Sequence, residues 1–428
     1  MTKLTERIGN LTPEQQELLR RRMEQMERRG PPNANARETS AAPRPASGPP
    51  TEMVNASYAP RRIDFSIFFF SANGDVDEDD RYRLLIESAR FADRNGFTAV
   101  WTPERHFQTF GGLYPNPAVL SAALAMITEN VQIRAGSVVL PLHSPVRVAE
   151  DWAVVDNLSR GRIGISFATG WHHHDYVIAP ANYADRRELM FRDIGVVRRL
   201  WAGEEVELPG PDGVKVRVKT LPRPVRRELP VWVTVVSPGT WRRAGEIGAN
   251  VLTALAGVPP EELRRRIAGY RKARLENGHD PRTGVVSVML HTCLGSDLEE
   301  VRNRVRGPMK NYLHSYLDQF RPMVGQGITD SSSAGMRDLL ELAFEHYFEN
   351  SSLLGTPQKC GAMLEKLAAA GVNEAACLID FGLDLGSTLE SLEHLAALRL
   401  SMAGEVNAAG EAGAAEALAP EAAGEILR

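Results

Sequence analysis

The sequence contains little cysteine. Only Cys293, Cys360 and Cys377 occur in 428 residues, and no pair has the CxxC spacing of a redox or structural zinc motif. Such sparse thiols exclude a disulfide framework and are typical of proteins that work in a reducing cytoplasm. We expect each of the three to be a small, buried hydrophobic side chain.

Long apolar runs and an excess of charge of one sign are also missing. No run approaches the roughly 20 residues of a membrane span, and the start, MTKLTERIGNLTPEQQ, lacks the apolar segment of a signal peptide. Lys and Arg total 50 against 54 for Asp and Glu, a net charge of -4. No electrostatic argument therefore favours nucleic acid or an anionic membrane as a partner. A cytoplasmic protein that acts on small molecules fits better.

Both ends of the chain have compositions that do not build a core. An amphipathic helix is predicted over 11–29, with Pro13 at its first position, and 30–60 is rich in Pro, Ala, Ser and Asn. The tail consists largely of Ala, Glu and Gly, with some helical character. We therefore divide the chain into a flexible N-terminal helix and linker (1–60), a main domain (61–403) and a flexible C-terminal tail (404–428).

The main domain alternates buried-strand and helical patterns. IDFSIFFF is a continuous apolar run, followed by a helical pattern over 81–95 that Gly96 closes. Eight strand patterns occur, at 63–70, 97–101, 131–139, 162–168, 230–236, 249–255, 285–294 and 374–380. Eight parallel strands linked by helices close as a barrel, and the absence of G-x-G-x-x-G after the first strand disfavours a dinucleotide-binding fold. The predicted fold is α/β, a TIM-type (β/α)8 barrel with insertions.

Two segments interrupt this alternation. Residues 203–230 are polar and Pro-rich with short-strand patterns, and 321–355 include the stretch GQGITDSSSAG ahead of the last strand. Long insertions at the carboxyl ends of barrel strands commonly act as lids. We expect 321–355 to cover part of the site.

Chemically capable residues follow the second strand. In such a barrel the active site lies at the carboxyl ends of the strands. Glu104, Arg105 and His106 bring together an acid, a permanent cation and a group that titrates near neutral pH. Arg105 would fix an anion and His106 would exchange a proton. The alternative is an ordinary surface ion pair.

Small residues and three histidines follow the fourth strand. Thr169 and Gly170, just before Trp171, are small enough to let a planar ring or a phosphate approach the backbone. The next residues are His172 to His174, but three consecutive side chains do not converge easily on one ion. We therefore predict no metal site, and the histidines belong either to a solvated loop or to the polar rim of a pocket.

A third candidate lies after the fifth strand, where Ser237, Gly239 and Thr240 lead into a predicted helix. Hydroxyls and N–H groups at a helix N-terminus suit an anion such as the phosphate monoester of a nucleotide. The alternative is an ordinary helix cap.

Four stretches together resemble the luciferase-like monooxygenase family. They are WTPERHFQTFGGLYPNP (101–117), IRAGSVVLPLHSPVRVAEDWAVVDNLSRGRIGISFATGW (133–171), VWVTVVSPGT (231–240) and LLGTPQKC (353–360). The resemblance is strongest to the branch found with nonribosomal peptide and polyketide biosynthesis, and it runs from about Ile63 to Leu400. It implies a TIM-type barrel that binds flavin mononucleotide (FMN).

The resemblance also assigns roles to residues at three strand ends. The FMN phosphate would be held by Ser237, Gly239 and Thr240, with help from Thr169, Gly170 and Trp171. The isoalloxazine ring would lie over Ala135, Gly136 and Ser137. Relatives often carry a non-proline cis peptide in this region, for which Gly136–Ser137 is the candidate.

Two positions depart from the luciferases of the family. These have Glu-His-His-Phe where this chain has Glu104 to Phe107, so their catalytic histidine falls on Arg105, which cannot act as a base at physiological pH. By the resemblance this segment lies near the reactive face of the flavin, with Arg105 stabilising an anion and His106 donating or orienting a proton. The luciferases also have an arginine at the position of Thr169, so either the phosphate would depend more on backbone N–H groups, or the flavin would bind weakly and transiently.

The implied activity is a monooxygenase that uses O₂ and reduced FMN from a separate flavin reductase. One oxygen atom would enter a peptide- or polyketide-type intermediate, free or tethered to a carrier protein, by hydroxylation, N-oxygenation or Baeyer–Villiger insertion. Two alternatives stay open: a deazaflavin (F420)-dependent oxidoreductase, and a non-catalytic barrel subunit of a flavin monooxygenase complex. The resemblance also implies a homodimer.

Overall fold

Eight parallel strands close into a barrel in the computed structural model, which describes residues 62–70, 80–255, 258–318 and 334–417. The strands are β1 (Asp64–Phe68), β2 (Ala99–Thr102), β3 (Gln132–Val139), β4 (Ile163–Ala168), β7 (Val231–Thr234), β8 (Asn250–Ala254), β9 (Val286–Leu294) and β11 (Glu374–Leu378). They pair in this order, and β11 pairs back onto β1. The eight predicted strands and the TIM-type barrel are confirmed.

The strands are apolar on both faces because both faces are covered. Outward side chains such as Ile67 and Val100 are fully buried in the core between strands and helices. Inside the barrel, near the amino ends of the strands, Arg134 Nη1 lies 2.7 Å from Glu374 Oε2. The Arg134 guanidinium also stacks 4.8 Å from the Trp101 ring. These side chains form a layer inside the barrel near the amino ends of the strands, and a ligand site is expected at the opposite, carboxyl ends.

Helices connect the strands. They are α4 (Arg83–Arg94), α5 (Pro117–Ala125), α6 (Pro145–Leu158), α7 (Arg186–Ala202), α8 (Pro238–Glu246), α9 (Pro260–Glu276), α10 (Leu298–Asp318), α12 (Ala334–Asn350), α13 (Pro357–Ala370) and α14 (Leu385–Ala417). The helix predicted after the first strand is confirmed as α4, and Gly96 follows it with a φ of +67°. Such a left-handed conformation favours glycine.

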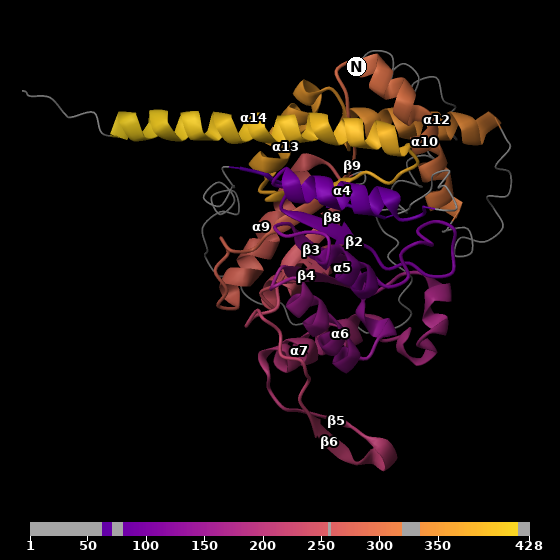
Figure 1. Ribbon diagram of the computed structural model, residues 1–428, viewed down its shortest axis with the longest axis vertical. Helices are drawn as coiled ribbons and strands as arrows, with labels where there is room; N and C mark the ends of the chain where they lie inside the picture. Colours follow the sequence, from indigo (N-terminus) through magenta and orange to yellow (C-terminus); the bar gives the residue numbers. More distant parts are fainter. Residues whose placement is uncertain (1–61, 71–79, 256–257, 319–333, 418–428) are drawn as a thin grey trace, which may run out of the picture. The chain divides into compact units, whose positions relative to one another are not determined.

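The two predicted insertions have different structures. Residues 203–230 contain the antiparallel pair β5 (Val206–Pro209) and β6 (Lys215–Val218), which projects away from the barrel (Figure 1). Residues 321–355 contain α12 and the short strand β10 (Leu353–Gly355), which pairs with β9. Most of the GQGITDSSSAG stretch lies outside the described residues.

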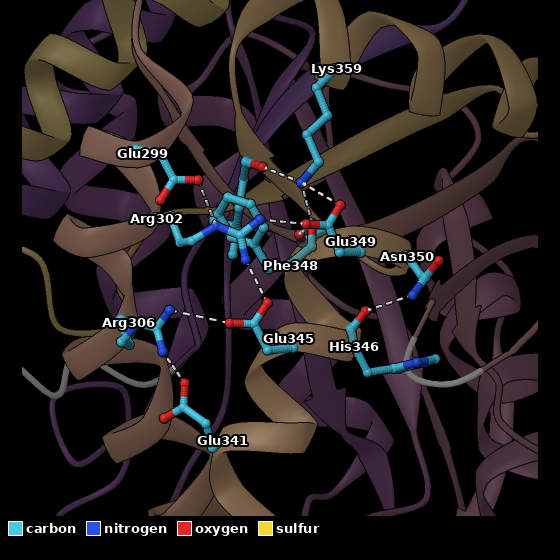
Figure 2. A network of polar contacts seen from close by, with 12 residues as sticks. Glu299, Arg302, Arg306, Glu341, Glu345, His346, Phe348, Glu349, Asn350 and Lys359 are labelled. Carbon is cyan, nitrogen blue, oxygen red and sulfur yellow. Dashed lines mark hydrogen bonds and ion pairs between the residues drawn. The ribbon is translucent and has the colours of Figure 1, made fainter. Parts of the chain in front are cut away.

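Charged and aromatic side chains join α12 to α10 (Figure 2). Arg302 of α10 contacts both Glu345 and Glu349, at 2.5 and 2.6 Å, and its guanidinium lies 4.3 Å from the ring of Phe348. Arg306 adds an ion pair to Glu341. The buried ring of Phe348 therefore packs beneath a layer of ion pairs.

The remaining sequence predictions concern the ends and the thiols. The helix predicted over 11–29 and its linker lie outside the described residues. Helix α14 runs across the domain boundary predicted at 403. The three cysteines are buried, as predicted, and burial raises the pKa of Cys293 to about 11. In the part of the chain that the structure describes, no helix is long and apolar enough to cross a membrane.

Candidate active site

Glu104 lies buried between the ends of two barrel strands. Its Oε2 accepts the Val139 N–H at 2.7 Å, while its Oε1 lies 2.9 Å from Nε2 of His106 and 2.6 Å from Nε2 of His143. The Glu104 side chain is inaccessible to solvent, which excludes the surface ion pair considered as the alternative. The carboxylate thus joins the loop after β2 to the end of β3.

Glu104 carries its negative charge at neutral pH. Burial alone would raise the pKa of this carboxyl, but hydrogen bonds from His106, His143 and Val139 outweigh burial and hold the pKa below its usual value. Burial likewise opposes protonation of His143, yet the bond to Glu104 prevails and raises the pKa of that imidazole. The site therefore contains a buried anion that favours protonation of the His143 ring.

Arg105 lies among aromatic rings. Its guanidinium carbon is 4.7 Å from the ring centre of Phe70, 5.1 Å from that of Phe110 and 6.0 Å from that of Trp171. A guanidinium is weakly hydrated and stacks well on such faces. The side chain is half-buried, so its charge can stabilise an anion more strongly than it would in open solvent.

The loop after β4 packs against the loop after β2. Gly170 has a φ of +62°, and a Cβ there would lie 2.7 Å from Cγ1 of Val139, so no other residue fits without a shift. Nε2 of His172 lies 2.6 Å from Nε2 of Gln108. Burial, and then the charge of Arg105, lower the pKa of His172 to about 4, so the ring is neutral at pH 7. His172 is therefore part of the wall of the site, whereas His173 and His174 are exposed.

Asp175 faces the same cluster, although it was not among the residues selected from the sequence. Burial raises the pKa of its carboxyl, against the opposing charges of His106 and Arg105. Its buried Oδ1 makes no hydrogen bond. A buried carboxylate oxygen without a donor is costly, so Asp175 is a further candidate to receive a hydrogen bond from a ligand.

The peptide bond between Gly136 and Ser137 is cis, as predicted. Ser137 Oγ lies 2.6 Å from Thr234 Oγ1, which lies 2.8 Å from Ser166 Oγ, so hydroxyls from β3, β7 and β4 meet inside the barrel mouth. A Cβ at Gly136 would lie 2.7 Å from the ring of Phe68. Ala135 differs from its neighbours, because its side chain packs in the core between strands and helices.

The start of α8 presents two side-chain hydroxyls beside an open space. Ser237 precedes the helix, but its side chain makes no capping bond to a backbone N–H; its Oγ lies 2.9 Å from Thr240 Oγ1 instead. A Cβ at Gly239 would have no atom within 4 Å, so the space beside the first turn is open. Two hydroxyls at the positive end of the helix dipole suit a phosphate. The ordinary helix cap that the sequence left open as an alternative is therefore not formed, because the Ser237 side chain accepts no backbone N–H.

These features gather on four neighbouring strands, since β2, β3, β4 and β7 are consecutive in the sheet. Arg105, with Glu104 and His106 beside it in sequence, lies near Trp171, and Ser137 belongs to the hydroxyl group centred on Thr234. His143, Asp175 and Thr234 were missed because their importance depends on contacts across strands. The available signal was their place at or soon after the carboxyl end of a strand.

A surface pocket adjoins this cluster. It has a volume of about 360 Å³ and is lined by Phe107, His174 and Val177. Phe107 follows His106 directly, has a φ of +57° and is 65% exposed. Among the described residues, no group of three His, Cys, Asp or Glu side chains could hold a metal ion.

Fold and site together define a barrel enzyme with its chemistry at the carboxyl ends of the strands. The sequence pattern of the luciferase-like monooxygenase family matches residues 63–374. The chain therefore belongs to the luciferase-like monooxygenase family, as the sequence resemblance implied.

Individual relatives agree with this assignment. The oxygenase component of the flavin-dependent trigonelline monooxygenase of Acinetobacter baylyi is 27% identical over 324 residues, which cover 73% of this chain and 88% of the relative. Monooxygenase RslO1 of Streptomyces bottropensis has a TM-score of 0.68 at 22% identity, with coverage of 79% of this chain and 99% of that one. The oxygenating constituent of 3,6-diketocamphane monooxygenase of Pseudomonas putida, solved with FMN, has a TM-score of 0.64 at 19% identity, covering 78% and 97%. At these identities the two structures support the barrel fold alone.

Proposed function

We propose that this flavin-dependent monooxygenase is the oxygenase component of a two-component system, in which a separate flavin reductase supplies reduced FMN. One atom of O₂ would pass to an organic substrate. The observation that carries the proposal is that the loop after β2 places ionised Glu104, which holds His106, beside Arg105, whose guanidinium lies against aromatic rings. The A. baylyi relative is itself an oxygenase component, which supports the proposal that a separate reductase supplies the reduced flavin.

The residues present fit FMN. Ser237 and Thr240 at the start of α8 would hold its phosphate, and the open space beside Gly239 would let the phosphate approach the backbone. Bound reduced flavin supplies the electrons that activate O₂. Arg105 would stabilise negative charge near the reacting atoms, His106 would deliver a proton, and the surrounding aromatic rings would exclude water.

The substrate we propose is a peptide- or polyketide-type intermediate with an apolar portion. The exposed side chains of Phe107 and Val177 line the pocket next to His106 and suit such a group. Hydroxylation, N-oxygenation and Baeyer–Villiger insertion are all compatible with one proton donor and one fixed cation. No feature of the described residues favours a deazaflavin over FMN.

We also propose a homodimer that forms through α5 and α6. These helices pack against each other, and both expose large apolar side chains. Val119 and Met126 are 65% and 68% exposed, while Val154 and Leu158 are 45% and 42% exposed. Exposed apolar side chains that lie together commonly mark an interaction site.

Isotope labelling tests the reaction. The chain, a flavin reductase, FMN and a candidate substrate are incubated under ¹⁸O₂, and the product is examined by mass spectrometry. We expect one ¹⁸O atom in the product and the other in water. A product without the label would indicate hydride transfer instead, and activity only with an added second barrel protein would indicate a non-catalytic subunit.

Gly239→Ala tests the cofactor site. The new methyl group meets no protein atom, and alanine favours a helix over glycine, so thermal stability should be maintained or slightly raised. If the phosphate approaches this turn, FMN affinity should fall about tenfold, which corresponds to roughly 1.4 kcal/mol. Flavin fluorescence quenching measures the affinity. Gly269→Ala in α9 is the matched control, because a Cβ there also has open space, and it should leave FMN binding unchanged.

A further inference from the structure

His143 is the residue outside the sequence predictions that touches the site most directly. It follows the 3-10 turn Leu140–Leu142 at the end of β3, and its backbone N–H donates to Leu140 at 3.0 Å, which fixes its position. Its Nε2 lies 2.6 Å from Glu104 Oε1, and its side chain is 32% exposed. His106, on the same oxygen, is only 11% exposed. The imidazole of His143 is therefore partly exposed to solvent, whereas that of His106 is mostly buried.

Three donors fix the Glu104 carboxylate. The Val139 N–H holds Oε2, and two imidazoles converge on Oε1. The last torsion of a glutamate side chain is broad and weakly restrained by itself. Without His143, two donors would remain and the plane of the carboxylate would be less well determined. The orientation that His106 receives from Glu104 thus depends in part on His143.

The contact with Glu104 also selects the tautomer of His106. A carboxylate accepts only, so Nε2 of His106 must carry a hydrogen. In the neutral ring Nδ1 is then the unprotonated nitrogen, and it is Nδ1 that takes up or releases a proton. A ring with the other tautomer would present the wrong nitrogen, a fault that can be as damaging as losing the residue.

We propose that His143 is a positioning residue: through Nε2–H it holds Glu104 in the orientation that keeps His106 in its Nε2–H tautomer, with Nδ1 as the atom that exchanges protons. The consequence for catalysis rests on the proposed function, whereas the tautomer does not. Other charged or titratable groups face the cluster and will contribute to its pH dependence: Arg105, Asp151, His174, Asp175 and Tyr176.

Three variants of the full chain test the proposal. His143→Ala removes the donor, while His143→Gln keeps a non-titrating N–H that can reach Glu104. His346→Ala, at an exposed position on α12, is the control. Long-range ¹H–¹⁵N correlation spectra of protein labelled with ¹⁵N-histidine report which nitrogen of His106 carries the hydrogen. Thermal unfolding confirms that each variant is folded, and His143→Asn, whose amide is too short to reach Glu104, replaces the alanine variant if that one unfolds.

We expect wild type, His143→Gln and His346→Ala to show only the Nε2–H tautomer of neutral His106, and His143→Ala to show a mixture. In the complete enzyme, kcat should fall about tenfold in His143→Ala with KM nearly unchanged, and His143→Gln should restore most of it. An unaltered His106 tautomer in His143→Ala would overturn the proposal. A wild-type chain that forms no oxygenated product would overturn the proposed function instead, and the spectra would still decide the role of His143.

Discussion

His172 shows how a single side chain can make this protein sensitive to acid. Its folded-state pKa of about 4 lies below the ordinary value of 6.5, because burial and then the charge of Arg105 disfavour the imidazolium. Between these two values the unfolded chain binds a proton that the folded chain does not, so stability falls as the pH drops from 6.5 towards 4. When the pH is lowered from 7 to 5, we expect the free energy of unfolding of wild type to fall by on the order of 1 kcal/mol more than that of His172→Gln. Urea denaturation at both pH values measures this, with exposed His346→Gln as the control; equal losses in wild type and His172→Gln would contradict it.

Among individual residues, the sequence predicts those whose chemistry is local. Glu104 and His106 are neighbours in the chain after a strand, and their contact needs no long-range information. His143 and Thr234 become important only because β3 lies beside β2 and because Ser137 reaches β7. One sequence contains no record of such cross-strand contacts.

At the scale of elements, the packing of α12 on α10 should depend on charge and apolar burial together. Phe348 is fully buried, and Lys359 and Arg302 both lie over its ring, at 3.7 and 4.3 Å (Figure 2). We expect Phe348→Ala to cost about 3 kcal/mol or more of folding free energy. Glu345→Gln, which weakens the contacts to Arg302 and Arg306, should cost about 1 kcal/mol, and less at high salt.

Denaturant titrations in low and high salt test this packing. Glu204→Gln is the matched control, because it weakens an exposed ion pair with Arg199 and should cost only a few tenths of a kcal/mol. A cost for Glu345→Gln no larger than that of the control would show that the network does not stabilise α12.

The strands were predictable because burial on both faces requires continuous apolar runs, which few other structures need. Helix α12 was not. Its stability comes from contacts with α10, such as the stacking of Arg302 and Arg306 on Phe348 and Phe344, rather than from a strong local signal. The stretch before it is rich in Gly and Ser, which is typical of a loop, so the sequence pattern did not indicate a helix in this segment.

At the scale of the whole molecule, the proposed homodimer predicts that one charge can separate the subunits. Val119 is 65% exposed on α5, the helix that packs against α6, so in the proposed dimer Val119→Asp would bury an unpaired carboxylate in the contact. We expect the dimer dissociation constant to rise about a hundredfold or more, since each factor of ten corresponds to about 1.4 kcal/mol. Sedimentation velocity over a range of concentrations measures it. Val214→Asp on the projecting hairpin is the control, because Val214 is 62% exposed but remote in sequence from α5 and α6. Wild type that sediments as a monomer at every concentration, or a control that dissociates as readily as Val119→Asp, would show that this face is not where two copies meet.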